Sequence, residues 1–179
     1  NERSVEEEWQ AMQNQIELYK LINSSVFIFA DVSGSIQGKP KIPLSKRPRL
    51  KDSEWSDYCN KISEIAKRLF DIGLPMSYHE HMGTIIQSEQ DVDRLLENTN
   101  DKTYLLFDTG HVLFAQGDYQ SMLKKHVSRI NHVHCKDIRK EVLNKSLLND
   151  LSFRDSFLKG VFTVPGDGCI NYKPLFKTL

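Results

Sequence analysis

Short apolar runs alternate with amphipathic segments along most of this chain. Residues 26–30 are continuously apolar, and residues 74–82, 103–108 and 130–137 also have the length and composition of strands. A continuous apolar run is typical of a strand that is buried on both faces of a parallel sheet. The pattern therefore predicts four parallel strands.

Amphipathic segments lie before and between these strands. Ser4 and Glu7 form a capping-box pattern, and apolar residues then recur at helical spacing, which predicts an opening helix. Ser53, Ser88 and Asp118 stand where they would cap three further helices. Strands that alternate with helices at this spacing indicate βαβ units, with binding groups at the carboxyl ends of the strands.

Four β/α units are fewer than a complete (β/α)8 barrel contains. The chain has 179 residues, whereas such a barrel takes about 250 residues. We therefore expect a single domain, residues 1–179, of the α/β class and with the form of a partial barrel. An open four-stranded segment exposes sheet edges, so we expect either a fragment or a chain that another segment completes.

Charge and cysteine content favour a small-molecule partner. Lysine plus arginine number 24 and aspartate plus glutamate also number 24, so no net field favours nucleic acid or an anionic membrane. The longest apolar run is far shorter than the roughly 20 residues of a membrane span, and no leader pattern opens the chain. Three separated cysteines without a CxxC pair indicate a reducing cytoplasm.

Two loops are placed to border a site. Residues 31–52 form a polar stretch with three prolines and a basic cluster, and this stretch is longer than an ordinary connection, as in loops that cover a site. Residues 164–168, VPGDG, are compatible with a rigid lip on a pocket, and a plain turn explains them as well.

Successive predicted strands end in residues that bind metals or carry protons. The two-residue period of a strand places His79 and His81 on one face and Glu80 on the other. Asp108 ends the next strand, and His111 follows it across a glycine. A carboxylate directly after a buried run is costly unless it is paired or bound to a cation. The alternative is that Asp108 caps the following turn.

The fourth predicted strand repeats the arrangement with His132 and His134. Imidazole and carboxylate suit zinc, manganese, iron or cobalt. Solvated side chains would explain one such strand end, but three in succession favour a shared site, because barrel sites lie at the strand ends. Lys136, Asp137 and Arg139 come next and are suited to orient hydroxyls or neutralise an enolate, with a solvated loop as the alternative.

Four motifs in order, YHEHMGT at 78–84, FDTGH at 107–111, INHVHCKDIR at 130–139 and FTVPGDG at 162–168, resemble the inosose dehydratases. Those enzymes belong to the xylose isomerase-like TIM barrels, which also include ketose epimerases and endonuclease IV. The resemblance implies an eight-stranded (β/α) barrel and a divalent metal, usually manganese or cobalt, with zinc or magnesium as alternatives. It also implies removal of water from an inosose, 2-keto-myo-inositol, in inositol breakdown.

The resemblance assigns metal ligands residue by residue. Asp108 matches the carboxylate ligand of the superfamily, and His134 matches its histidine ligand. His79 falls where the epimerases have a glutamate ligand, so Glu80 is the alternative to His79. The matched region corresponds to the fourth through seventh barrel strands, and the last strand normally brings a closing glutamate ligand.

The implied reaction is a β-elimination that needs an acid and a base. His111 matches a substrate-binding histidine of the epimerases, and His81 and His111 are the candidate catalytic residues. Lys136, Asp137 and Arg139 are the candidate substrate-binding residues for a cyclic polyol ketone. The alternatives are a metal-dependent ketose isomerase or epimerase and an inactive partial barrel that serves as a binding or scaffold module. A basic stripe that would favour an endonuclease is absent, and a homo-oligomer stays open.

Overall fold

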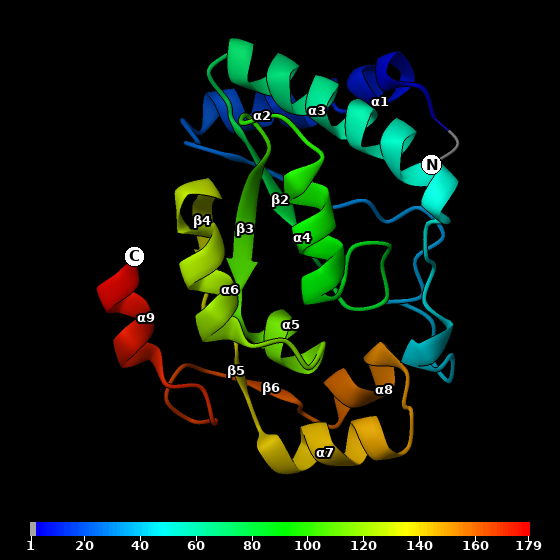
Figure 1. Cartoon of the computed structure of the whole chain (residues 1–179), viewed down its shortest axis with the longest axis vertical. Helices are drawn as coiled ribbons and strands as arrows, with labels where there is room; N and C mark the ends of the chain where they lie inside the picture. The colour runs from blue at the N-terminus through cyan, green and yellow to red at the C-terminus, as the bar shows by residue number, and fades with distance from the viewer. Residues whose placement is uncertain (1–2) are drawn as a thin grey trace.

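A four-stranded parallel sheet forms the centre of the computed structural model, which describes residues 3–179 (Figure 1). The strands lie side by side in chain order: β1 (Phe27–Phe29), β2 (Met76–His79), β3 (Tyr104–Asp108) and β4 (Ile130–His134). All three strand pairs are parallel. The carboxyl ends of the strands therefore open at one edge of the sheet, and the predicted partial α/β barrel is confirmed.

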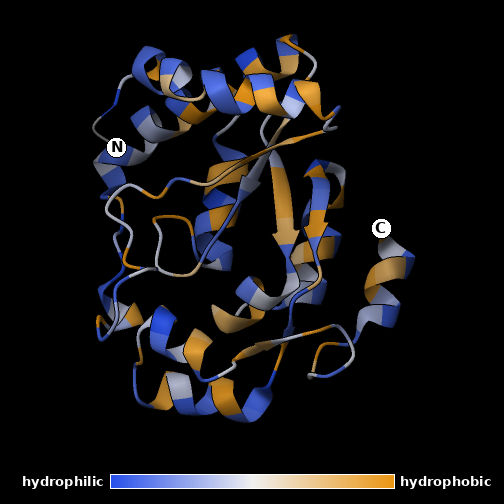
Figure 2. Ribbon diagram, turned by 180° about the vertical axis from the view of Figure 1, so that it is seen from behind, coloured by the Kyte–Doolittle hydropathy of each residue, from blue (hydrophilic) through white to orange (hydrophobic). Residues whose placement is uncertain are grey.

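Helices precede, connect and follow the strands. They are α1 (Val5–Ala11), α2 (Gln13–Leu21), α3 (Trp55–Asp71), α4 (Glu89–Glu97), α5 (Thr109–Phe114), α6 (Tyr119–His126), α7 (Lys140–Leu148), α8 (Phe153–Leu158) and α9 (Tyr172–Thr178). Helices α4 and α6 lie in front of the strands in Figure 1. The view from behind shows the opposite face with no helix of the described chain lying across it (Figure 2). Each helix of residues 3–179 is too short or too polar to cross a bilayer.

The core lies between the sheet and α3, α4 and α6. The predicted apolar face of α3 is buried, and it consists of Trp55, Tyr58, Cys59, Ile62, Ile65, Ala66 and Leu69. Tyr78 of β2 packs against Phe29 of β1, with ring centroids 5.9 Å apart. Full burial of one such large apolar side chain stabilises the fold by about 1.5–3 kcal/mol, so this layer holds the strand ends in place.

Capping explains most helix starts. Ser4 accepts from the backbone N–H of Glu7, Ser88 caps α4, and Asp118 caps α6 through two backbone N–H groups, as the sequence predicts. The prediction for Ser53 is wrong. Ser53 lies inside the short 3-10 helix η2 (Asp52–Glu54), which runs directly into α3, so its side chain is not at the cap position.

Other elements also differ from the sequence prediction. The opening helix is two helices, because Met12 ends α1 and begins α2. The second strand ends at His79 rather than at Met82. Two further short strands, β5 (Asp137–Ile138) and β6 (Phe162–Thr163), form an antiparallel pair. Strands of two residues are too short to display an alternating pattern, so the sequence gives no sign of them.

The long loop after β1 reaches the segment around α7 and α8. It contains the 3-10 helix η1 (Leu44–Lys46). Another 3-10 helix, η3 (Val127–Arg129), lies outside this loop and precedes β4. The N–H of Leu44 donates to the carbonyl of Leu151 at 3.3 Å, and the N–H of Lys41 donates to the carboxylate of Asp155 at 3.0 Å. These contacts join the loop to α7 and α8, which lie beyond the strand ends in Figure 1.

Candidate metal and acid-base site

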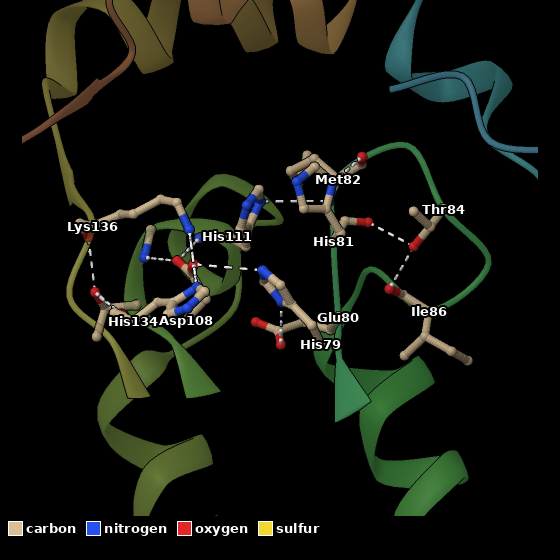
Figure 3. A network of polar contacts seen from close by, with 12 residues as sticks. His79, Glu80, His81, Met82, Thr84, Ile86, Asp108, His111, His134 and Lys136 are labelled. Carbon is tan, nitrogen blue, oxygen red and sulfur yellow. Dashed lines mark hydrogen bonds and ion pairs between the residues drawn. The ribbon is translucent and has the colours of Figure 1, made fainter. Parts of the chain in front are cut away.

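Four histidines and one aspartate meet at the carboxyl ends of β2, β3 and β4 (Figure 3). Asp108 ends β3 and stands in register with His134, which ends β4. His79 ends β2, His81 follows it in the next loop, and His111 lies in α5. The structure thus brings together all three predicted metal ligands and both predicted catalytic histidines.

Potential ligand atoms in this group lie close together. His79, Asp108 and His111 each present one ligand atom, and these atoms lie within 4.8 Å of one another. His79 Nε2 lies 3.9 Å from Asp108 Oδ2, and His134 Nδ1 lies 3.2 Å from the same oxygen. The ring of His132 lies beside His134, with centroids 5.4 Å apart. Imidazole nitrogen with carboxylate oxygen is a donor set that suits a first-row divalent ion.

Asp108 uses its two oxygens differently. Oδ1 accepts from the N–H groups of Gly110 at 3.0 Å and His111 at 3.1 Å, which caps α5. Oδ2 faces His134 and the ammonium of Lys136. Asp108 therefore caps α5 with one oxygen and belongs to the histidine cluster through the other.

The charge of Asp108 is stabilised by its neighbours. Burial alone would raise the pKa of its carboxyl group, but the hydrogen bond with His134 and the charge of Lys136 lower that pKa below its ordinary range. The close approach of Lys136 depends on Gly110, since a Cβ there would lie 2.7 Å from Cβ of Lys136. Asp108 consequently stays ionised at neutral pH.

Three histidines near Asp108, namely His79, His81 and His111, are neutral at pH 7. Burial lowers the pKa of His79 to about 3, and it lowers the pKa values of His81 and His111 as well. Neutral imidazole retains the lone pair that metal binding and proton abstraction require. The rings of His81 and His111 are adjacent, with centroids 3.9 Å apart.

The peptide groups of Met82 give these two histidines complementary proton positions. His81 Nδ1 lies 2.9 Å from the carbonyl oxygen of Met82, so it must be the donor and its Nε2 carries a lone pair. The N–H of Met82 points to Nδ1 of His111 at 3.5 Å, so that nitrogen is the acceptor and Nε2 of His111 carries the proton. One ring is therefore prepared to accept a proton and the other to donate one.

Glu80 lies fully buried beside His79. Its Oε2 lies 3.7 Å from Nδ1 of His79, which differs from the expected placement on opposite faces. Strand alternation does not apply here, because β2 ends at His79. Burial and then the charge of Asp108 raise the pKa of Glu80 well above its ordinary value.

Two phenylalanines cover the histidine pair, and sequence reasoning missed both. The ring of Phe153 in α8 has its centroid 5.0 Å from His81 and 5.7 Å from His111. The ring of Phe162 in β6 lies 5.2 Å from His111. Phe162 opens the FTVPGDG motif, which could have indicated it, whereas Phe153 belongs to no motif. This wall explains the burial of His111 and limits the access of water.

Among the predicted substrate-binding residues, Lys136 reaches the cluster and Asp137 does not. The carboxylate of Asp137 is fully buried. Oδ1 accepts from the N–H groups of Ile138 at 2.8 Å and Ile170 at 2.9 Å. Oδ2 accepts from those of Gly166 at 2.9 Å and Gly168 at 3.1 Å. These bonds occupy both oxygens and fix the loop that follows β6, so a contact between Asp137 and a substrate stays a prediction.

Arg139 holds the same loop from its exposed side. Its guanidinium donates to the carbonyl oxygen of Gly160 at 2.9 Å and to Oγ1 of Thr163 at 2.8 Å. It also contacts the carboxylate of Asp167 at 3.0 Å. The contacts of Arg139 therefore lie before β6, within it and on the turn after it. Lys136 remains the candidate substrate contact beside the histidines.

A model of the xylose isomerase-like TIM barrel family matches residues 1–179. The chain belongs to this family. Among solved structures, the probable 3-DHS dehydratase AsbF from Bacillus anthracis has a TM-score of 0.71 at 14% sequence identity. The match covers 99% of this chain and 61% of the AsbF chain. The IolI protein, with a bound zinc atom, has a TM-score of 0.64 at 13% identity, covering 94% and 54%. These two likenesses concern the barrel fold.

Curated relatives within the family confirm the predicted likeness to inosose dehydratases. The inosose dehydratase of Halalkalibacterium halodurans is 42% identical over 159 residues, which cover 88% of this chain and 52% of the relative. The rhizopine catabolism protein MocC of Rhizobium meliloti is 39% identical over 178 residues, which cover 99% and 55%. The chain thus spans about half the length of the curated relatives it matches.

Asp137→Ala is expected to destabilise this family member by about 2–4 kcal/mol, since backbone N–H groups lose a charged acceptor. Urea unfolding measures the difference in the free energy of unfolding. Asp57→Ala, which removes a carboxylate that is 71% exposed, is the control and should change the stability by less than about 0.5 kcal/mol. Equal effects of the two substitutions would contradict the loop-fixing role of Asp137.

Acid is expected to destabilise the metal-free protein through its buried histidines. The folded-state pKa values of His79, His81 and His111 lie below the ordinary 6.5. Below about pH 6.5 the unfolded chain therefore binds more protons than the folded chain, and the free energy of unfolding falls. Above pH 4.5, Glu80 has the opposite effect on the free energy of unfolding, because its pKa is raised in the folded protein. It is one group, whereas three histidines act in the other direction.

Denaturation curves at pH 7 and pH 5 measure this effect. The expected loss is about 1.4 kcal/mol per pH unit for each net proton that unfolding takes up. Glu80→Gln removes the opposing group and should make the loss steeper. A free energy of unfolding that stays constant or rises toward pH 5 would show that these imidazoles are not held neutral by burial.

Proposed function

We propose that this chain carries the metal-binding and acid-base residues of an inosose dehydratase, a hydro-lyase that removes water from 2-keto-myo-inositol. One observation carries the proposal. A buried carboxylate, potential ligand histidines and a pair of neutral histidines converge at one sheet edge. The 42% identity to an inosose dehydratase over 159 residues supports the choice of substrate.

The proposed metal ligands are His79, Asp108 and His134. Their donor set, two imidazoles with a carboxylate, fits manganese or cobalt, and zinc and magnesium are the alternatives. Lys136 contacts Asp108 in the present arrangement. A divalent ion would take over this charge balance and leave the ammonium available to substrate oxygens. When bound, the ion would polarise the ketone and acidify the neighbouring C–H group.

The proposed base is His81 and the proposed acid is His111. Nε2 of His81 carries a lone pair and accepts the proton from the carbon next to the ketone. Nε2 of His111 carries a proton and gives it to the hydroxyl group that departs, so that a C=C bond forms and water leaves. Phe153 and Phe162 keep bulk water from this pair. Inositol breakdown in the cytoplasm is the corresponding physiological setting.

The test compares two substrates with the purified, cobalt- or manganese-loaded protein. We expect 2-keto-myo-inositol to give the ultraviolet absorbance of a dione and a ketohexose to be recovered unchanged. Chelation should stop the reaction, and added metal should restore it. Conversion of the ketohexose alone would replace the proposal by a ketose isomerase or epimerase. If neither substrate is converted and no metal is bound, the result would favour the alternative of an inactive binding or scaffold module.

A further inference from the structure

Glu80 is a buried acid without a hydrogen-bond partner. Its side chain is fully buried, and neither of its carboxylate oxygens has a partner within the described chain. A buried polar group in this situation costs free energy. Groups of this kind are uncommon in native proteins and call for an explanation at the site where they occur.

The explanation lies in the adjacent ring of His79. Nδ1 of His79 is also buried and lacks a partner among residues 3–179. The nearest acid to it is Glu80, whose Oε2 lies 3.7 Å away. The other ring nitrogen, Nε2, lies 3.9 Å from Oδ2 of Asp108. Each nitrogen of His79 therefore faces a different carboxyl group (Figure 3).

We propose that Glu80 is a positioning residue that holds the His79 ring through Nδ1 and keeps Nε2 directed toward Asp108. Histidines that bind metals commonly engage a carboxylate through the second ring nitrogen, which fixes the ring orientation. In this arrangement Glu80 is not itself a ligand, and Asp108 and Glu80 act on opposite nitrogens of one imidazole. The inference rests on the proposed metal-binding role of His79.

Metal affinity provides the first test. In a cobalt titration, Glu80→Leu is expected to weaken binding about 10–100-fold, as for other partners that orient ligand histidines. Glu80→Gln retains a polar group for Nδ1 and should lose less affinity than Glu80→Leu. Glu97→Leu, at a glutamate whose side chain is 65% exposed, is the control and should bind like the wild type. An affinity of Glu80→Leu within twofold of the wild type would overturn the proposal.

Thermal unfolding of the metal-free protein separates positioning from a structural role. Removal of an unpartnered buried acid should raise the Tm of Glu80→Leu by roughly 2–4 °C. A variant that is more stable and yet binds metal more weakly supports positioning. A lower Tm with unchanged affinity would assign Glu80 to the fold alone.

The state of the His79 ring gives a readout without metal or turnover. Nitrogen-15 NMR of the metal-free wild type should show His79 mainly as the tautomer with its proton on Nδ1, which leaves a lone pair on Nε2, and Glu80→Gln should shift or mix this tautomer. An identical His79 spectrum in Glu80→Gln would overturn the proposal even if Glu80→Leu fails to fold. This readout needs no substrate. Absence of inosose dehydration would therefore contradict the proposed function alone, and the NMR spectrum would still decide the role of Glu80.

Discussion

Asp108→Asn is expected to leave the protein folded but without bound divalent metal, and to reduce turnover by at least about a thousandfold. Asparagine retains an oxygen that can accept from the N–H groups of Gly110 and His111, so the cap of α5 survives. It loses the negative charge on the oxygen that faces His134 and Lys136. A bound metal supplies several kcal/mol of charge stabilisation, which corresponds to about three powers of ten in rate.

The alanine variant serves as the comparison. Asp108→Ala removes the cap together with the charge, and the lost cap should lower the free energy of unfolding by about 0.5–2 kcal/mol. Elemental analysis and urea unfolding of both variants separate the two functions of the side chain. Stoichiometric metal in Asp108→Asn would remove Asp108 from the ligand set.

His111→Gln is expected to retain the metal while turnover falls about 10²–10⁴-fold, the usual contribution of a general acid. His111 presents a ligand atom within 4.8 Å of His79 and Asp108, so distance alone also admits it as a ligand. The N–H of Met82, 3.5 Å from Nδ1 of His111, favours the proposed acid role, because the remaining nitrogen then carries a proton and has no lone pair for a metal.

The matched variant is His134→Gln, which should lose metal and activity together. Metal content and turnover of the two variants, measured side by side, distinguish a ligand from an acid. Loss of metal from His111→Gln with retention in His134→Gln would exchange the two roles and make His111 the third ligand.

The sheet was predictable because its strand segments are short and rich in apolar residues, although only the inner strands β2 and β3 are almost wholly buried. Residues 26–30 and 104–107 are continuous apolar runs of the kind found in parallel strands, and both segments contain observed strands. Helix α5 was hidden, since Thr109 and Gly110 have weak helix propensity and resemble a turn. Only the two hydrogen bonds to Asp108 show that a helix begins there.

The meeting of the histidines was predictable in outline from the strand ends, whereas the detailed roles were not. The sequence predicted that Asp137 contacts a substrate. In the structure its carboxylate accepts from four backbone N–H groups, of which the most distant in sequence is 33 positions away. The aromatic cover of His81 depends on Phe153, which is distant in sequence and marked by no pattern. Tertiary contacts of this kind leave no local signal, so sequence periodicity does not reveal them.

A cobalt titration followed by visible absorption tests most directly whether the ends of β2, β3 and β4 hold one cation. The predicted result is saturation at one Co²⁺ per chain, with a spectrum typical of nitrogen and oxygen ligands, and loss of that spectrum in Asp108→Asn. Absence of saturable absorption in the wild type, or the same spectrum in Asp108→Asn, would contradict the assignment of a metal to this cluster.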